Sequence, residues 1–200
     1  NSLKQLSSLG VDSVSVSGLD AGDALSVDLG GFTAGGVALH HVGFDSALDV
    51  TLNVANLNQL NVAAGLAGQL AGDNIDRVQI NLQADHGNYQ SALDSLLTGG
   101  AGASGKTDAD GHALNVLQAD VAALSASGLD VDTIDLGGAG VSASVDITQA
   151  QAAELVSAGL HFAGTDDITL NVAASTEGTH LHNSLKQLSS LGVDSVSVSG

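Results

Sequence analysis

The feature that most constrains this chain is a segment that occurs twice. Residues 1–18 read NSLKQLSSLGVDSVSVSG, and residues 183–200 repeat them letter for letter. An identity of this length does not arise by chance in a chain of 200 residues. The offset of 182 residues predicts a tandem array, in which residues 1–182 form one long repeat and residues 183–200 begin the next, identical one. The start at Asn1, inside a motif, fits a window cut from a longer protein, and a duplicated terminal tag is the alternative.

A shorter period lies inside the long one. Apolar stretches with helical spacing end repeatedly in a glycine, and these glycines lie 27 to 33 residues apart. Regular spacing of this size is typical of repeat architectures. We therefore predict that each long repeat contains six strand–helix units of about thirty residues. The glycines are at positions 10, 43, 72, 99, 128, 159 and 192.

The segments before these glycines predict helices. Their apolar residues recur at steps of three and four, which places them on one helix face. A glycine just past the end can adopt the left-handed conformation that terminates a helix. Thr148 and Gln151 have the spacing of a capping box, and the segment 33–42 has the weakest helical pattern. The predicted helices cover residues 3–9, 57–70, 92–97, 114–124 and 152–156.

The segments after the glycines predict strands. Apolar and polar residues alternate there, with Val and Ile enriched, as in half-buried strands. These segments are residues 11–17, 48–54, 75–82, 131–136 and 167–172, with further strand-like pieces at 24–29 and 141–147.

Strands that alternate with helices predict an α/β fold with a parallel sheet and right-handed crossovers. Two architectures are open at this point. The units can stack into an open solenoid that runs through the whole array, or each long repeat can close as a separate domain with a seam or linker at 173–182. The solenoid is favoured because the thirty-residue rhythm continues across the seam.

The charge and composition exclude several classes of protein. Asp and Glu number 22 against 4 Lys and Arg, so the formal net charge of −18 argues against a nucleic-acid partner. The absence of Cys excludes disulfides and thiolate metal sites. No apolar run reaches the roughly 18 residues of a membrane span, and no signal-peptide pattern is present. Hydrophobic residues make up 44% and aromatic residues 2%, which predicts an ordered, thin, aliphatic core.

Residues 98–112 break the pattern because they contain no Val, Ile or Leu, and they predict a long exposed loop. Within them, KTDADG resembles part of an EF-hand loop, although Lys106 and Leu117 occupy the first and twelfth ligand positions. Asp108, Asp110 and Asp120 are the candidate Ca²⁺ ligands, and a solvated turn is the alternative. Other acidic clusters, at 130–135 and 166–167, predict diffuse binding of divalent cations that relieves carboxylate repulsion.

Other chemistry has weaker support in the sequence. His180 and His182 share one face of an extended segment and can chelate Zn²⁺ or Ni²⁺, but surface histidines are favoured for them and for His40 and His41. No G-x-S-x-G motif is present, and GGAGASGK lacks the spacing of a phosphate-binding loop. We therefore predict a protein that is not an enzyme. A polysaccharide-active enzyme on a repeat scaffold is an alternative.

A family resemblance rests on the helix followed by Leu-Gly-Val-Asp-x-Val-x-Val in SLKQLSSLGVDSVSVSG, and more loosely on VAALSASGLDVDTIDL. This pattern resembles the repeats of giant, acidic, repeat-rich bacterial surface and secreted proteins of the adhesin or matrix type, commonly exported by type I secretion. The resemblance implies an extracellular or cell-surface repeat segment, acting as a spacer or fibre-forming scaffold in attachment or biofilm. The nonapeptide G-G-x-G-x-D-x-U-x of such proteins is absent, so the resemblance does not imply calcium dependence.

The partners expected for such a segment are neighbouring identical repeats or chains. Uncapped ends of a repeat array expose strand edges and apolar surface, which predicts self-association end to end. No membrane insertion is expected. A Ca²⁺-dependent binding module is the remaining alternative.

Overall fold

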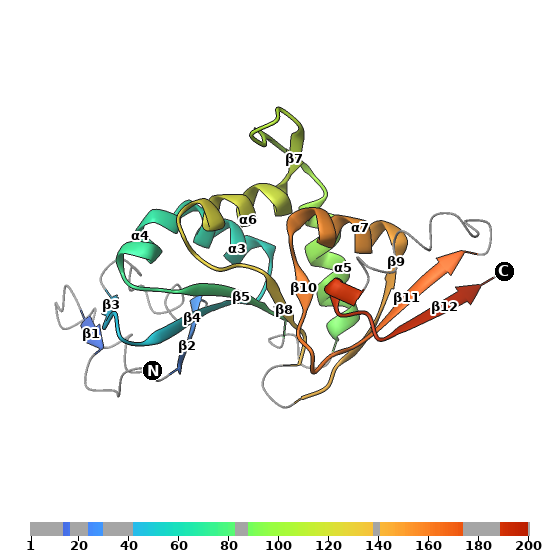
Figure 1. Cartoon of the computed structure of the whole chain (residues 1–200), viewed down its shortest axis with the longest axis horizontal. Helices are drawn as coiled ribbons and strands as arrows, with labels where there is room; N and C mark the ends of the chain where they lie inside the picture. Colours follow the sequence, from blue (N-terminus) through green and yellow to red (C-terminus); the bar gives the residue numbers. More distant parts are fainter. Residues whose placement is uncertain are drawn as a thin grey trace. The chain divides into compact units, whose positions relative to one another are not determined.

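The fold was analysed in a computed structural model, which describes residues 14–16, 24–29, 42–82, 88–137, 141–173 and 189–199 (Figure 1). The chain forms two compact units: Asn1–Ile80 with Ala122–Val131, and Asn81–Val121 with Asp132–Gly200. Helices alternate with strands, and the ladders between described strands are parallel apart from one hairpin. The predicted α/β class with parallel sheets is confirmed. The solenoid and the thirty-residue repeat remain predictions.

The first unit is built on a parallel sheet with β4 at its centre. Strand β4 (Asp49–Val54) pairs on one side with β2 (Ala24–Asp28) and on the other with β5 (Arg77–Asn81). A separate parallel pair joins β1 (Val14–Val16) to β3 (Val42–Phe44). Helices α3 (Leu57–Gly65) and α4 (Ala67–Gly72) connect β4 to β5, and α6 (Val116–Ala126) precedes residues 127–131.

The second unit contains a three-stranded parallel sheet in the order β12-β11-β9. Helix α7 packs on β9 and β11, and α5 packs on β9. A short parallel pair, β8 with β10, and an antiparallel hairpin complete the described elements of this unit. The bounds are α5 (Tyr89–Gly100), β6 (Ala103–Thr107), β7 (Ala113–Asn115), β8 (Thr133–Asp135), β9 (Ser144–Thr148), α7 (Gln149–Ala158), β10 (His161–Phe162), β11 (Asp167–Ala173) and β12 (Ser195–Ser199).

The core of each unit is aliphatic, as the composition predicts. Along β4 every second side chain is buried, and Val50, Leu52 and Val54 are inaccessible to solvent. Leu60 of α3 is also buried, and this helix packs on β4. Each such side chain stabilises the fold by about 1.5–3 kcal/mol relative to an exposed position. The alternating sequence pattern thus identified the buried face correctly.

Three predicted helix ends are confirmed by backbone geometry. Gly128, Gly159 and Gly192 have positive φ angles of 88°, 74° and 81°. Gly159 directly follows α7, and the predicted capping box of Thr148 and Gln151 opens the same helix. A left-handed residue costs glycine little, because glycine has no Cβ to clash with the neighbouring carbonyl.

Three other glycines do not have the predicted role of a left-handed residue just past the end of a helix. Gly43 lies within β3, and Gly99 lies inside α5, which continues to Gly100. Gly72 is the last residue of α4, and Asn74 takes the left-handed conformation with φ of 59°. The Asn74 side-chain amide donates a hydrogen bond of 2.7 Å to the Phe44 carbonyl. This bond stabilises Asn74 in the left-handed conformation that the prediction assigned to Gly72.

The prediction of one long exposed loop at residues 98–112 is wrong, because part of this segment is regular secondary structure. It contains the end of α5 and strand β6, which pairs antiparallel with β7. Ser104 Oγ donates a 2.7 Å hydrogen bond to the Leu114 carbonyl across the hairpin. Four of the five residues of β6 are exposed and no residue of either strand is buried, so this hairpin forms through backbone pairing without a buried apolar face. The expectation that these residues contain no buried strand is confirmed.

Several predictions fall outside the described residues. These are the helix before Gly10, the first part of the strand at 11–17, most of the segment 33–42, His40 and His41, the seam beyond residue 173, and His180 with His182.

Candidate functional site

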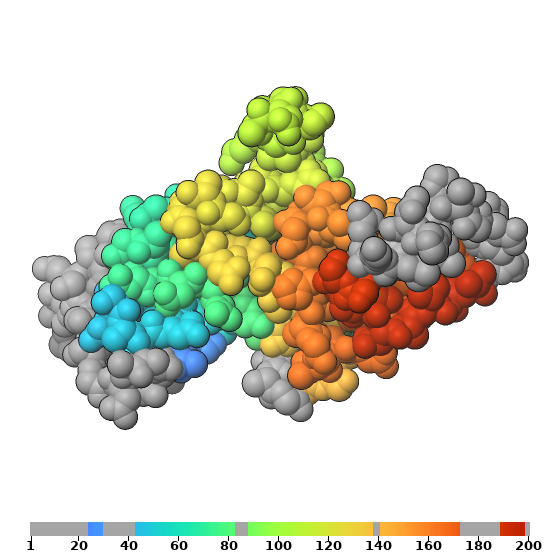
Figure 2. Space-filling model, in the orientation of Figure 1, coloured from blue at the N-terminus to red at the C-terminus, as the bar shows by residue number. Residues whose placement is uncertain are grey.

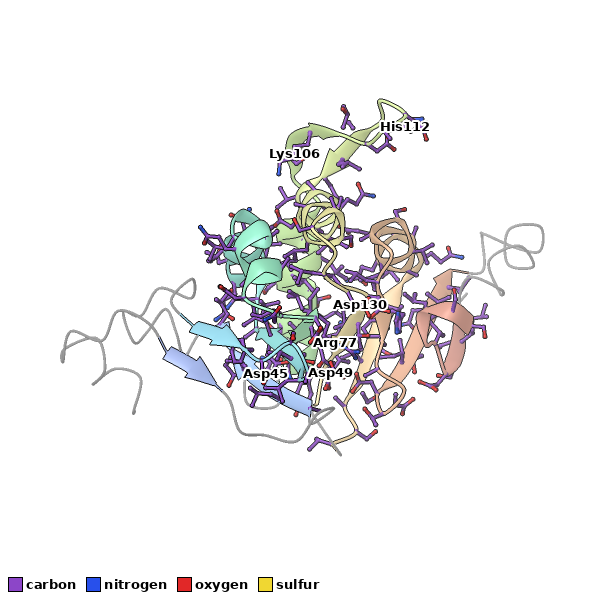
Figure 3. All side chains as sticks on the ribbon, turned by 60° about the vertical axis from the view of Figure 1, so that its left-hand side comes forward. Asp45, Asp49, Arg77, Lys106, His112 and Asp130 are labelled. Carbon is purple, nitrogen blue, oxygen red and sulfur yellow. The ribbon has the colours of Figure 1, made fainter. Side chains whose placement is uncertain are left out.

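A cluster of metal-ligating side chains lies at the turn of the β6–β7 hairpin. Ligand atoms of Asp108, Asp110 and His112 all lie within 4.8 Å of one another, and all three residues are exposed. Figure 2 shows the hairpin as a projecting knob, and Figure 3 places His112 at its far end, away from Lys106. Two carboxylates and an imidazole at this separation can hold a metal ion.

Backbone hydrogen bonds hold this cluster in shape. Asp108 Oδ1 accepts hydrogen bonds from the backbone N–H of Asp110 (2.9 Å) and of His112 (2.8 Å). Its Oδ2 lies 3.1 Å from His112 Nδ1. These contacts, led by the backbone N–H of His112, lower the pKa of Asp108. Asp108 therefore stays ionised in mildly acidic solution, and the turn is ordered by its own bonds.

The structure gathers only part of the predicted ligand set. Asp108 and Asp110 belong to the cluster, but Asp120 does not. Asp120 lies on α6 with 3% of its surface exposed, whereas the cluster is in solvent. The sequence analysis missed His112, although its place two residues after Asp110 continues the every-second-residue spacing of the acids.

A second recurring feature is an Asp that joins two parallel strands. Asp76 Oδ2 accepts a 2.7 Å hydrogen bond from the Val50 backbone N–H, and the Asp76 N–H donates to the Val50 carbonyl at 3.0 Å. Asp194 makes the same pair of bonds with Ile168, at 2.9 Å and 3.0 Å. Both pairs are 26 residues apart in the chain. We call this arrangement the Asp latch.

The Asp latch explains part of the acidic composition. Asp76 lies directly before β5, and Asp194 lies directly before β12. In both cases the carboxylate satisfies a backbone donor on a neighbouring buried residue, a role for which Asp is well suited. These two acids therefore have a structural partner and do not depend on a cation for one.

Asp166 is a related but more deeply buried carboxylate. Its Oδ2 accepts a 3.0 Å hydrogen bond from the Leu136 backbone N–H, while its Oδ1 is buried with no partner among the described residues. Burial raises the pKa of Asp166, and the nearby charge of Asp135 raises it further, against the lowering effect of the Leu136 hydrogen bond. This acid, predicted as part of a diffuse cation-binding surface, lies in the interior with 5% exposure.

The second copy of the repeated segment is built into the second unit. Strand β12 pairs with β11 over five residues, from Thr169 opposite Ser195 to Ala173 opposite Ser199. Leu191, just before it, is 1% exposed. Gly192 packs against the Phe162 backbone, where an added Cβ would lie 3.1 Å from the Phe162 carbonyl oxygen. Strand β12, from the second copy of the repeated segment, thus extends the sheet that β11 and β9 form.

Comparison with protein-family models, with curated proteins and with solved structures gave no match to this chain. Across the ranges that the structure describes, no helix has both the length and the apolar character of a membrane span.

Proposed function

We propose that this chain is a repeat segment of an extracellular structural protein, a filament or giant adhesin in which it acts as a spacer or fibre-forming scaffold. The observation that carries the proposal is the pairing of β12, the start of a second identical repeat, with β11 of the first. Consecutive repeats are then joined by backbone hydrogen bonds, and the array acts as one continuous support.

The contacts at this junction favour a stiff connection over a flexible linker. A five-residue parallel ladder, the Asp194 latch and the buried Leu191 all act at the same place. Each hydrogen bond contributes about 0.5–1.5 kcal/mol, and burial of one Leu about 1.5–3 kcal/mol. Because these contacts lie at the same junction, a force along the array acts on several of them at once. A spacer that holds a terminal module away from a surface needs this stiffness.

The test compares chains with one, two and four copies of the 182-residue repeat, each followed by residues 183–200. In a continuous array, small-angle scattering gives a maximum dimension that grows by a constant amount with each copy. Growth with the square root of copy number, as in flexibly linked beads, would contradict the proposal.

Substitution at the junction sharpens this test. We expect the array to become more flexible when Asp194→Ala is introduced at every junction, because this substitution removes the acceptor for the Ile168 N–H. Asp146→Ala is the matched control, since Asp146 is an exposed residue of β9 with only backbone hydrogen bonds described. Equal flexibility of the two variants would argue against a latch at the junction.

A Ca²⁺-dependent binding module is a second candidate, favoured by the Asp108–Asp110–His112 cluster. Carboxylate oxygens suit Ca²⁺, whereas the imidazole suits Zn²⁺ or Ni²⁺. Ca²⁺ at a hundredfold excess over its Kd would stabilise the fold by about 2.7 kcal/mol. The melting temperature should rise with Ca²⁺ and fall with chelator, and Asp110→Asn should abolish the response. A melting temperature that does not respond to Ca²⁺ rules this candidate out.

A polysaccharide-active enzyme is less favoured. A pocket beside α5 is lined by polar side chains, but Asp94 is the one carboxylate among its lining residues. Asp94 already accepts hydrogen bonds from the amides of Gln90 (3.2 Å) and Gln151 (2.9 Å). Glycoside hydrolysis commonly uses two carboxylates on opposite sides of the bond. This pocket therefore does not offer the pair of carboxylates that such an enzyme commonly uses.

A further inference from the structure

We infer that the strand repeated at residues 14–16 and 196–198 is shared between consecutive repeats, with its second edge paired to Val42–Phe44 of the next copy. This inference deepens the proposed function and rests on it. It names the partner as a second copy of this chain and the contact as a parallel ladder.

The same three residues pair with two different strands. At the start of the chain, Val14, Ser15 and Val16 form β1 and lie opposite Val42, Gly43 and Phe44 of β3. At the end of the chain, Val196, Ser197 and Val198 belong to β12 and lie opposite Leu170, Asn171 and Val172 of β11. Both ladders are parallel. One sequence therefore has two pairing partners, which is what a strand in the middle of a sheet requires.

Among the strands that the structure describes, β12 has a neighbour, β11, on one edge only. The order β12-β11-β9 places β12 at the edge of its sheet, as Figure 1 shows. Val196 and Val198 are 41% and 63% exposed, among the few large apolar side chains with such exposure in the part described. An exposed apolar edge strand is a template for pairing with another chain. The β3 strand is the occupant that this sequence already accepts at residues 14–16.

The register of β1 with β3, applied to β12 of one molecule and β3 of the next, defines the contact between the two molecules. Ser197 of one molecule lies opposite Gly43 of the next, with Val196 opposite Val42 and Val198 opposite Phe44. Within one molecule β3 is paired with its own β1, but β1 and the incoming strand are identical in sequence. Exchange of one for the other leaves the paired residues unchanged, as in domain swapping. The isolated 200-residue chain should therefore associate head to tail.

The absence of Cys from the chain permits a direct test in the full 200-residue protein. One batch carries Ser197→Cys and a second carries Gly43→Cys, and the two are mixed and oxidised. An added Cβ at Gly43 meets nothing within 4 Å, so this substitution fits the fold. Gly65→Cys is the matched control, because Gly65 has the same open space but lies in α3. A single chain with both Ser15→Cys and Gly43→Cys gives the intramolecular reference.

We expect the Ser197/Gly43 mixture to form a disulfide-linked dimer severalfold faster than the Ser197/Gly65 mixture, and faster still at high salt, which screens the charge of −18. Equal rates for the two mixtures would overturn the shared strand. Sedimentation of the unmodified chain provides a second measurement, and a protein that stays monomeric up to millimolar concentration also overturns it. Failure of the copy-number scattering test alone would reject the stiff array but leave this pairing intact.

Discussion

At the scale of single residues, Asp76 and Asp194 both accept a hydrogen bond from the backbone N–H of a residue on a neighbouring strand. An unpaired backbone N–H in a buried position costs about 1–3 kcal/mol. Val50 is inaccessible to solvent, and its N–H is satisfied by the Asp76 carboxylate. Asp194 has the same role at the start of the second copy. A sequence rich in Asp can therefore be acidic for structural reasons and still be stable.

The first prediction concerns the Asp76 latch. Asp76→Ala should lower the free energy of unfolding by about 1–3 kcal/mol, because the Val50 N–H loses its acceptor. Asp76→Asn keeps a carbonyl oxygen for this bond and should lose less. Chemical denaturation measures all three proteins, with Asp146→Ala as the exposed control. A loss in Asp76→Ala no larger than in the control would show that the latch does not stabilise the fold.

The second prediction concerns pH and Asp166. Because burial raises the pKa of Asp166 in the folded state, its contribution to stability is complete below the ordinary Asp pKa of about 3.9 and is lost as pH rises through the folded value. Asp166→Asn cannot ionise, and its carbonyl oxygen can still accept the Leu136 N–H.

The variant should therefore be more stable than the natural chain at neutral pH, and the difference should shrink as the pH falls through the acidic range. Thermal unfolding at a series of pH values measures this difference. Asp146→Asn, at an exposed position, should show no such convergence. A variant that is less stable than the natural chain at neutral pH would show that the ionised Asp166 is required.

At the scale of secondary structure, local end signals decided where helices stop. Helix α7 has both a capping box and a left-handed glycine, and the structure places its ends where the pattern predicts. The predicted helix at 57–70 instead divides into α3 and α4 at Leu66, whose ψ of 7° departs from helical geometry. Gly65 and Gly68 flank this break, and glycine weakens a helix interior.

The third prediction tests the helix end at Gly159. Gly159→Ala should destabilise the chain by about 1 kcal/mol, because a Cβ at φ of 74° clashes with the backbone although the space around it is open. Gly65→Ala also has open space but lies at the end of α3 without a positive φ, so it should be neutral or slightly stabilising. Thermal unfolding separates the two variants, and equal effects would contradict the conformational argument.

At the scale of the whole molecule, the proposed array would gain negative charge with every repeat. Residues 183–200 contribute Lys186 and Asp194, whose charges cancel, so the 182-residue repeat alone carries the net charge of −18. In the proposed array, each chain would be a polyanion that repels other chains, while strand pairing would hold consecutive repeats together. Screening by salt should weaken the repulsion and leave the backbone hydrogen bonds intact.

The fourth prediction follows from this balance. End-to-end association of the 200-residue chain should increase when monovalent salt is raised from low to physiological concentration, as measured by sedimentation velocity. If carboxylate repulsion alone opposes association, Na⁺ and Ca²⁺ at equal ionic strength should act alike. A much larger effect of Ca²⁺ would instead indicate bound calcium, and the Asp110→Asn variant would locate it. Association that weakens with salt would contradict the proposed strand pairing.

Much of the fold was predictable because its signals are local. The alternating pattern at 48–54 encodes β4, and the spacing at 148–151 encodes the start of α7. The hairpin was missed because β6 contains no Val, Ile or Leu to mark it as a strand. Of the metal cluster, Asp108 and Asp110 were found from their spacing, whereas His112 joins them through the turn itself.

The sequence by itself determined the α/β class, the aliphatic character of the core and the repetition of residues 1–18 at 183–200, because periodicity and composition are properties of the chain alone. Only the tertiary structure decided which strands pair and what the acidic residues do. An Asp becomes a latch when it meets a backbone N–H on a strand 26 residues away, and no local pattern specifies that meeting. The pairing of β12 with β11 arises in the same way, from hydrogen bonds between segments that only the folded chain brings together.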